Sequence, residues 1–291
     1  MRWRTSRRRA LSLLTLVTLP LTAVVAVSDS AQASVPAPPA GFTLTWSDDF
    51  NGAAGTGIDQ SLWKYDTGPG STFGTGEIET MTSSTSNVYY DGQSHLVLQA
   101  LHSGSDARSG WTSGRVETQA ATFGAAAGGV VRIESILQQP NVNTANGAGY
   151  WPAFWMLGAP LRSGVAWPGS GEIDVAEYYS RYPDRVIPFL HYAPTKYDAN
   201  MTNNNCLVAD PSAFHTYTLE WTNTAITISF DGKTCLTDSN WSPVGHKKPY
   251  PFNSPFMVAL TQGLGSTGND YVAGTTPLPA TMKVDYVRVW S

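Results

Sequence analysis

The sequence predicts an all-β protein, a sandwich or barrel, and at this length a β-jelly-roll is the all-β fold that best manages its sheet edges. Short segments rich in β-branched and aromatic residues recur along the chain, separated by Gly, Pro, Asn and Asp. Beyond the N-terminal segment, no amphipathic pattern of twelve or more residues carries helix caps. Two Asp-Gly pairs, Asp91-Gly92 and Asp231-Gly232, lie between strand-like runs and predict β-hairpins.

The predicted strands show no internal repeat at the periods of solenoids or propellers. Some alternate apolar and polar residues, as expected where one face of a strand is buried, and others are almost entirely apolar. In chain order they cover residues 43–50, 87–90, 95–101, 114–119, 129–137, 154–157, 172–178, 214–221, 225–230, 256–260 and 282–290. A β-rich stretch of roughly 250 residues is within the range of a single large all-β domain.

The N-terminus has the pattern of a secretory signal peptide. Five arginines fall within residues 2–9, an apolar stretch covers 10–27, and 31–33 (AQA) provides a small-residue cleavage site. The alternative is a membrane anchor, but Thr, Ser and Pro interrupt the apolar run and no second hydrophobic span follows. We therefore expect a signal peptide over residues 1–33, export by the Sec or twin-arginine route, and a secreted protein with no membrane partner. Residues 34–40 (SVPAPPA) form a Pro/Ala linker that cannot pack a core.

Charge and cysteine content are typical of an extracellular protein. The chain has 18 basic and 22 acidic residues, and removing residues 1–33, with five arginines and one aspartate, leaves a net charge of −8. This balance argues against a nucleic-acid partner, whose phosphates require a basic face, and it suits an extracellular protein that acts on a neutral polymer. We expect the protein to be a monomer. Cys206 and Cys235 are expected to form a disulfide. Catalytic or metal-binding thiols are the alternative, which the absence of a C-x-x-C motif disfavours.

Residues 171–179 (GEIDVAEYY) place three acids within six positions of a segment otherwise built from strand formers. On a regular strand Glu172 and Asp174 share one face, whereas Glu177 points to the other. One extra residue at Val175-Ala176, a β-bulge, would return Glu177 to the face of the other two acids. The sequence therefore predicts three carboxyl groups on one face of a bulged strand.

Clustered carboxyl groups of this kind fit glycoside hydrolysis, which needs a carboxylate and a carboxylic acid on opposite sides of the anomeric carbon. Retaining chemistry places the two groups about 5–5.5 Å apart, a separation that two glutamates on one curved strand can reach. The alternatives are a calcium site or a solvated edge strand. Calcium ligands usually come from an Asp/Asn/Gly loop, and a solvated edge usually includes lysine, which is absent between residues 163 and 184.

Tryptophans surround the acidic run and favour carbohydrate binding. Trp151, Trp155 and Trp167 precede it, and flat indole rings can stack on the apolar faces of sugar rings. Alternation in WPAFWML puts Trp151 and Trp155 on one face, which leaves open that one of them is buried support instead of a sugar platform. Trp46, Trp63, Trp221 and Trp290 lie in strand-like runs and are expected to pack in the core.

The motifs WPAFWMLG, WPGSGEIDVAEYY, TSGRVET, FHTYTLEW and MKVDYVRVW resemble those of family 16 glycoside hydrolases, in particular the laminarinase-like branch. The similarity covers residues 41–291, which we expect to form the catalytic domain, and E-x-D-x-x-E is the bulged form of the family motif. The resemblance implies a jelly roll of two curved antiparallel sheets with a concave substrate cleft. It also implies retention through a glycosyl-enzyme intermediate, with no cofactor in catalysis.

The resemblance also implies roles for individual residues. Glu172 matches the nucleophile, Glu177 the acid/base, and Asp174 an assisting acid beside the nucleophile. The positions matched to substrate-binding residues are Trp151 and Trp167 beside the cleaved bond, His191 near the acid/base, and Arg115 and Glu77 on the glycone side. A structural histidine is the alternative for His191.

A structural calcium ion on the face opposite the chemistry is a further implication. The matching positions are Asp49, the backbone carbonyl of Gly92, and Asp285, three groups from distant segments. Ordinary surface acids are the alternative for Asp49 and Asp285.

Two stretches depart from the family pattern, residues 260–265 (LTQGLG) and 73–77 (FGTGE). Both are expected to face the cleft, and Gln262 is the polar residue that we expect to contact substrate in the first. These departures affect the identity of the substrate and not the bond-cleaving chemistry. The expected substrate is a β-1,3-glucan or β-1,3/1,4-glucan, and a β-galactan or another polysaccharide is the alternative. Transglycosylation and glycan binding without turnover are the alternative activities.

Overall fold

A computed structural model describes residues 39–196, 198–265 and 268–291. The predicted signal peptide over 1–33 lies outside these residues, as does all but the end of the predicted linker over 34–40. Among the described residues, regular structure is almost all β, interrupted only by three short 3-10 helices. None of the helices in this part of the chain is long and apolar enough to cross a membrane.

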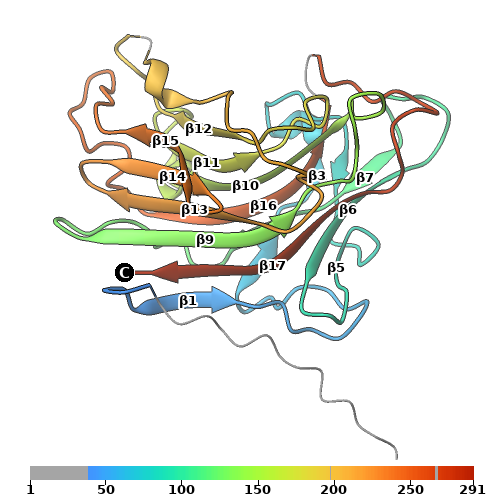
Figure 1. The fold of residues 1–291 in the computed structure, drawn as a ribbon, viewed down its shortest axis with the longest axis horizontal. Helices are drawn as coiled ribbons and strands as arrows, with labels where there is room; N and C mark the ends of the chain where they lie inside the picture. The colour runs from blue at the N-terminus through green and yellow to red at the C-terminus, as the bar shows by residue number, and fades with distance from the viewer. Residues whose placement is uncertain (1–38, 197, 266–267) are drawn as a thin grey trace, which may run out of the picture. The chain divides into compact units, whose positions relative to one another are not determined.

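The strands form two sheets, and the all-β prediction is confirmed (Figure 1). The larger sheet has the order β15-β14-β13-β9-β17-β6-β7-β4-β3, with β1 beside β17 and β5 beside β6; the smaller has the order β12-β11-β10-β16-β8-β2. The bounds are β1 Leu44–Asp48, β2 Trp63–Tyr65, β3 Gly68–Pro69, β4 Thr80–Met81, β5 Val88–Tyr90, β6 Leu96–His102, β7 Trp111–Ser113, β8 Arg115–Thr118, β9 Val130–Gln138, β10 Tyr150–Gly158, β11 Glu172–Glu177, β12 Ile187–His191, β13 His215–Thr222, β14 Ile226–Phe230, β15 Lys233–Asp238, β16 Phe256–Leu264 and β17 Ala280–Trp290. The 3-10 helices are η1 Gly70–Thr72, η2 Ala159–Ser163 and η3 Ala199–Met201.

Every predicted strand segment overlaps an observed strand, but β10, β16 and β17 are longer than predicted. β10 begins at Tyr150 and β16 ends at Leu264, so the two strands pair over nine residues. Pro152 interrupts the apolar run in β10, and proline normally argues against a central strand. β2, β3, β4 and β7 are only two or three residues long, which is too short for a period-two pattern to be recognised.

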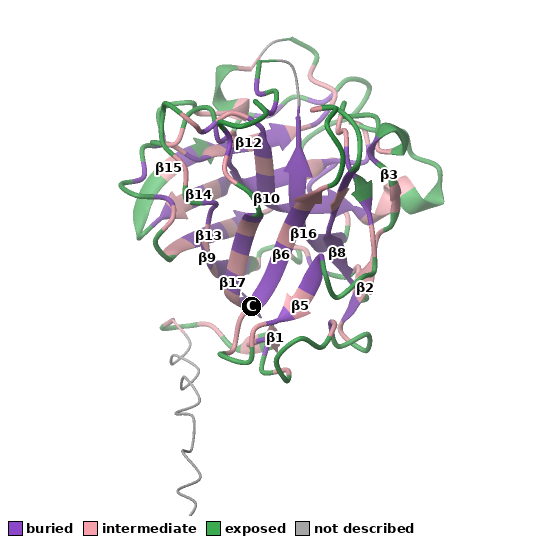
Figure 2. Cartoon of the chain, turned by 90° about the vertical axis from the view of Figure 1, so that its right-hand side faces the viewer, coloured by how far each residue is buried: buried purple, intermediate pink, exposed green. Residues whose placement is uncertain are grey.

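The core lies between the two sheets. One continuous cluster of buried side chains joins residues of the smaller sheet, such as Phe154 and Ile173, to residues of the larger sheet, such as Leu219 and Val287. Figure 2 shows this burial along the strands, with exposed residues concentrated in the loops. Trp63, Trp221 and Trp290 are at most 2% exposed, and Trp46 packs against the same cluster, which confirms that these tryptophans are packing residues.

The two predicted β-hairpins and the predicted disulfide are all present. Asp231 and Gly232 have φ values of 48° and 75°, as a two-residue type I′ hairpin requires, and they join β14 to β15. The hairpin between β5 and β6 also forms, around Asp91 and Gly92. Cys206 and Cys235 form a disulfide with a Cα–Cα distance of 5.6 Å, so the predicted pairing is confirmed.

Candidate active site

A β-bulge in β11 places the three acids on one face of the smaller sheet. Across β10, Trp155 pairs with Asp174 but Phe154 pairs with Ala176, so β11 holds one extra residue, Val175. Val175 and Ala176 are both fully buried in the core between the sheets. The alternation therefore resumes one residue late, and the predicted bulge at this position is confirmed.

The acids lie on the outer face of the smaller sheet, opposite the core. On this face of β10 and β16, a separate apolar cluster contains Ala153, Trp155, Leu157, Met257 and Ala259. The segment around η2 covers part of the cluster through Ala159 and Leu161. The acids lie on β11, between β10 and β12.

Glu177 accepts two hydrogen bonds from aromatic residues. Trp151 Nε1 donates to its Oε1 at 2.9 Å, and Tyr179 Oη donates to the same oxygen at 3.2 Å. The two donor rings stack on each other with centroids 5.1 Å apart. Tyr179 was not predicted as a site residue, although it lies two positions after Glu177 and so shares its face.

Glu172 and Asp174 face His191 of the neighbouring strand. Glu172 pairs directly with His191 across β11 and β12, and His191 Nε2 lies 3.0 Å from Asp174 Oδ2 and 3.7 Å from Glu172 Oε1. His191 was expected near the acid/base candidate Glu177; it acts on the pKa of Glu177, but its short contacts are with Asp174 and Glu172. The antiparallel register sets its position, because it opposes the first residue of β11 instead of the last.

Burial raises the pKa of all three acids. It raises the pKa of Glu172 to about 8 and that of Glu177 to about 8, and the carboxyl group of Asp174 contributes to both increases. Burial also raises the pKa of Asp174. Opposing effects come from His191 at both glutamates, from Arg115 at Glu172, and from the Trp151 hydrogen bond at Glu177. The three groups cannot all ionise together near neutral pH, so the site holds protons beside carboxylates.

The predicted tryptophans differ in exposure. Trp167, in the segment between β10 and β11, is 53% exposed, and its ring centroid lies 5.4 Å from that of His191. Trp155 is 9% exposed and donates from Nε1 to Thr261 Oγ1 at 3.0 Å. Of the pair Trp151 and Trp155, Trp155 is therefore the buried support.

Arg115 lies on the same outer face, three strands from the acids, but is nearly covered. Its guanidinium lies 4.6 Å from the ring centroids of both Phe73 and Trp155, and it is 6% exposed. Arg115 Nε lies 3.1 Å from Asp66 Oδ2 and its Nη2 lies 3.0 Å from Glu117 Oε1. Glu117 lies two residues further along β8 and so shares the face of Arg115, whereas the other partners come from β10, the segment after β2 and the end of η1, which no local pattern indicates.

Glu77 lies beside Arg115 and next to a second buried acid, Glu79, that was not predicted. Burial raises the pKa of Glu77, and nearby Arg115 opposes that shift. Glu79 is 1% exposed, and burial with the adjacent Glu77 raises its pKa to about 8. Its Oε2 accepts hydrogen bonds from the backbone N–H groups of Ile78 and Leu264 at 3.1 and 3.2 Å.

The prediction that Gln262 faces substrate is wrong. Its side chain is fully buried, and Nε2 donates to the carbonyl of Gly263 at 3.3 Å. Gln262 lies between Leu260 and Leu264 in the alternation of β16, whose buried side chains pack in apolar core clusters. The residue of this stretch on the outer face is its neighbour Thr261, which accepts the Trp155 hydrogen bond.

The predicted calcium ligands lie away from the acids. Asp49 Oδ1 accepts hydrogen bonds from Arg288 Nε at 3.0 Å and Nη2 at 2.6 Å, so a cation already supplies positive charge to this carboxylate. Burial raises the pKa of Asp285, and nearby Asp49 adds to the increase. These residues fit a calcium ion in part, because Asp285 would gain a partner while Asp49 would be shared with Arg288. Calcium binding here stays a prediction.

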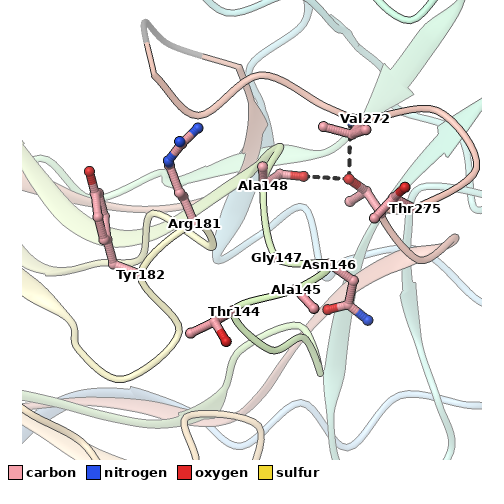
Figure 3. Close-up of a pocket in the computed structure, with 10 residues that line it drawn as sticks. Thr144, Ala145, Asn146, Gly147, Ala148, Arg181, Tyr182, Val272 and Thr275 are labelled. Carbon is pink, nitrogen blue, oxygen red and sulfur yellow. Dashed lines mark hydrogen bonds between the residues drawn. The ribbon is translucent and has the colours of Figure 1, made fainter.

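A pocket of about 250 Å³ lies beyond the ends of the central strands of the smaller sheet (Figure 3). It is lined by Thr144–Ala148 before β10, Arg181 and Tyr182 after β11, and Val272, Thr275 and Thr276 between β16 and β17. Thr276 Oγ1 donates to the carbonyl of Ala148 and accepts from the N–H of Val272, which joins two of these segments. None of the three acids lines this pocket.

A β-sandwich with three acids and exposed aromatic rings on the open face of one sheet has the features of a glycan-cleaving hydrolase. The family comparison agrees, since the description "Glycosyl hydrolases family 16" matches residues 76–288. The chain belongs to glycoside hydrolase family 16, and the laminarinase-like resemblance is confirmed.

Several known relatives are β-glucan hydrolases. The chain is 32% identical over 303 residues to glucan endo-1,3-β-glucosidase A1 of Niallia circulans, a match that covers 91% of this chain but 40% of that protein. It is 30% identical to a β-glucanase of Rhodothermus marinus, with 86% of this chain and 85% of that protein covered. The crystal structure of endo-1,3-β-glucanase from Streptomyces sioyaensis matches with a TM-score of 0.77 at 37% identity, covering 88% of this chain and 99% of that one.

Proposed function

We propose that this chain is a secreted, retaining endo-β-1,3-glucanase or β-1,3/1,4-glucanase, with Glu172 as nucleophile and Glu177 as acid/base. The observation that carries the proposal is the bulge in β11, which brings both glutamates to one face in different surroundings. The Glu172 side chain is 17% exposed and lies beside His191, whereas Glu177 is held by Trp151 and Tyr179. The relatives that act on β-glucans support the substrate class.

In the first step, Glu177 gives its proton to the departing glycosidic oxygen while the Glu172 carboxylate forms a bond to the anomeric carbon. The raised pKa of Glu177, which burial sets at about 8, keeps this proton in place at neutral pH. Burial raises the pKa of Glu172 to about 8 as well, and nearby His191 and Arg115 oppose that shift toward the ionised form that attack requires. In the second step, Glu177 removes a proton from water, whose oxygen replaces Glu172 at the anomeric carbon.

Asp174 is a positioning residue in this mechanism. It is 3% exposed and lies between the two glutamates along β11, where its charge acts on both. Burial raises the pKa of Asp174, which favours its protonated form. We expect Asp174→Asn to lower kcat more than it changes KM and to move the pH profile, which a purely structural role would not do.

The substrate is tested by product analysis on a panel of laminarin, lichenan, agarose, carrageenan and galactan. The proposal expects short oligosaccharides from laminarin, and from lichenan if β-1,3/1,4-glucan is also a substrate. Glu172→Gln and Glu177→Gln should each abolish turnover while the chain still folds. Activity confined to agarose, carrageenan or galactan would indicate a galactan hydrolase instead of a glucanase. Binding without turnover of any polymer in the panel would refute hydrolysis.

Secretion is tested by the mature N-terminus. The small-residue pattern at 31–33 predicts that protein recovered from culture medium begins at Ser34. Protein that stays with the cells and retains Met1 would contradict export.

A further inference from the structure

Three side chains on the outer face form a donor set for a divalent metal ion. Glu172, Asp174 and His191 each offer one ligand atom, and these atoms all lie within 4.8 Å of one another. His191 Nε2 is 3.0 Å from Asp174 Oδ2 and 3.7 Å from Glu172 Oε1. Donor atoms bound at about 2.1 Å to one tetrahedral ion are roughly 3–3.5 Å apart, so small side-chain movements would complete the set.

The donor atoms are held in place, and one of them lacks a partner. Asp174 is 3% exposed, and its buried Oδ2 forms no hydrogen bond with the described part of the chain, although His191 Nε2 lies 3.0 Å away. The His191 ring stacks on Phe189 with centroids 4.1 Å apart and planes 3° apart. A buried carboxyl oxygen without a partner is costly, and a cation would relieve that cost.

We propose that Glu172, Asp174 and His191 bind a divalent transition metal ion such as Zn²⁺ or Cu²⁺, and that the bound ion blocks the enzyme. One imidazole with carboxylates suits Zn²⁺ and Cu²⁺, whereas Mg²⁺ and Ca²⁺ prefer all-oxygen sites. The inhibitory part rests on the proposed function, in which Glu172 attacks the anomeric carbon. An ion bound to Glu172 occupies the oxygen that would form that bond, so metal and polysaccharide compete.

Metal binding is measured directly, without turnover, by titrating the purified chain with Co²⁺ and following its visible absorption. Tetrahedral coordination gives intense bands, and Zn²⁺ should displace them. We expect His191→Asn to weaken Co²⁺ binding by at least about tenfold. Even the loss of a residue that only hydrogen-bonds to a metal ligand weakens metal binding by about that factor. The matched control is His246→Ala, since His246 is an exposed histidine stacked on Tyr250 at 3.9 Å; its affinity should match the wild type. Equal Co²⁺ affinity in wild type and His191→Asn would overturn the site.

Inhibition is measured on whichever glycan the enzyme cleaves. Zn²⁺ should raise KM while kcat stays constant, and the same concentration of Mg²⁺ should change neither. The His191→Asn variant, compared with its own metal-free rate, should lose most of the Zn²⁺ effect, and His246→Ala should keep it. If Co²⁺ binding depends on His191 but Zn²⁺ inhibition is noncompetitive, the proposed competition between metal and substrate is wrong. Because the Co²⁺ titration needs no substrate, failure of the glucanase assignment would not obscure its result.

Discussion

The two hydrogen bonds to Glu177 give a graded prediction for the pH dependence of catalysis. Both donors favour the ionised carboxylate, so removing either one should raise the pKa of Glu177. Trp151→Phe removes the 2.9 Å bond, and Tyr179→Phe removes the longer bond at 3.2 Å while keeping the phenyl ring that stacks on Trp151.

The magnitude follows from the strength of a hydrogen bond to a charged group, about 1.5–3 kcal/mol, and one pKa unit corresponds to about 1.4 kcal/mol. Loss of the Trp151 N–H should therefore raise the pKa of Glu177 by about one unit or more. The longer Tyr179 bond should contribute less. Because the general acid must be protonated, the alkaline limb of kcat/KM against pH should move to higher pH in both variants, and further in Trp151→Phe.

The assay is kcat/KM at closely spaced pH values for wild type and both variants on one short oligosaccharide. The matched tryptophan control is Trp167→Phe, which changes an exposed ring without a hydrogen bond to Glu177 among the described residues. Its alkaline limb should not move even if KM rises. A limb that moves to lower pH in Trp151→Phe, or moves equally in Trp167→Phe, would refute the assignment of Glu177 as the acid that these bonds tune.

Three further predictions concern stability. Burial holds the pKa of Glu79 near 8, above its ordinary value of 4.5, so the folded state binds more protons and the unfolding free energy should fall as pH rises from about 4.5 to 8. Because Glu172 and Glu177 have similarly raised pKa values, Glu79→Gln should reduce this decline without abolishing it, and an unchanged Tm–pH slope would count against it. The disulfide closes a loop with a sequence separation of 29, so Cys206→Ser/Cys235→Ser should lower the unfolding free energy in urea by roughly 3–4 kcal/mol, whereas a loss below about 1 kcal/mol would contradict the loop-closure reasoning. Saturating calcium should raise the Tm and EDTA should reverse the rise; the same response in Asp285→Asn would place the ion elsewhere.

The strongest sequence predictions were those determined by local alternation. The spacing of the three acids in residues 172–177 predicts a bulge that brings Glu177 to the face of the other two. The pairing of β11 with β10 shows this bulge. The same reasoning would have found Tyr179, which lies two residues beyond Glu177. It would also have corrected Gln262, had β16 been extended to Leu264, since Thr261 then takes the outer face.

Other parts of the site depend on pairing between distant segments. The place of His191 is set by the register of β12 against β11, which no local pattern specifies. Arg115 meets Phe73 and Asp66 only because the segments after η1 and β2 lie against β8. The burial of Glu79 likewise comes from its contact with Leu264, 185 positions away in the chain. Such contacts require the three-dimensional structure.

Trapping the glycosyl-enzyme intermediate tests the central claim most directly. A β-glucosyl oligosaccharide with fluorine at C2 and a good leaving group should react once and stay bound, because the fluorine slows the second step more than the activated first step. After protease digestion, mass spectrometry should locate the added sugar on Glu172, and Glu172→Gln should remain unlabelled. Labelling of Asp174 or Glu177, or steady turnover of ordinary substrate by Glu172→Gln, would contradict the assignment of the nucleophile.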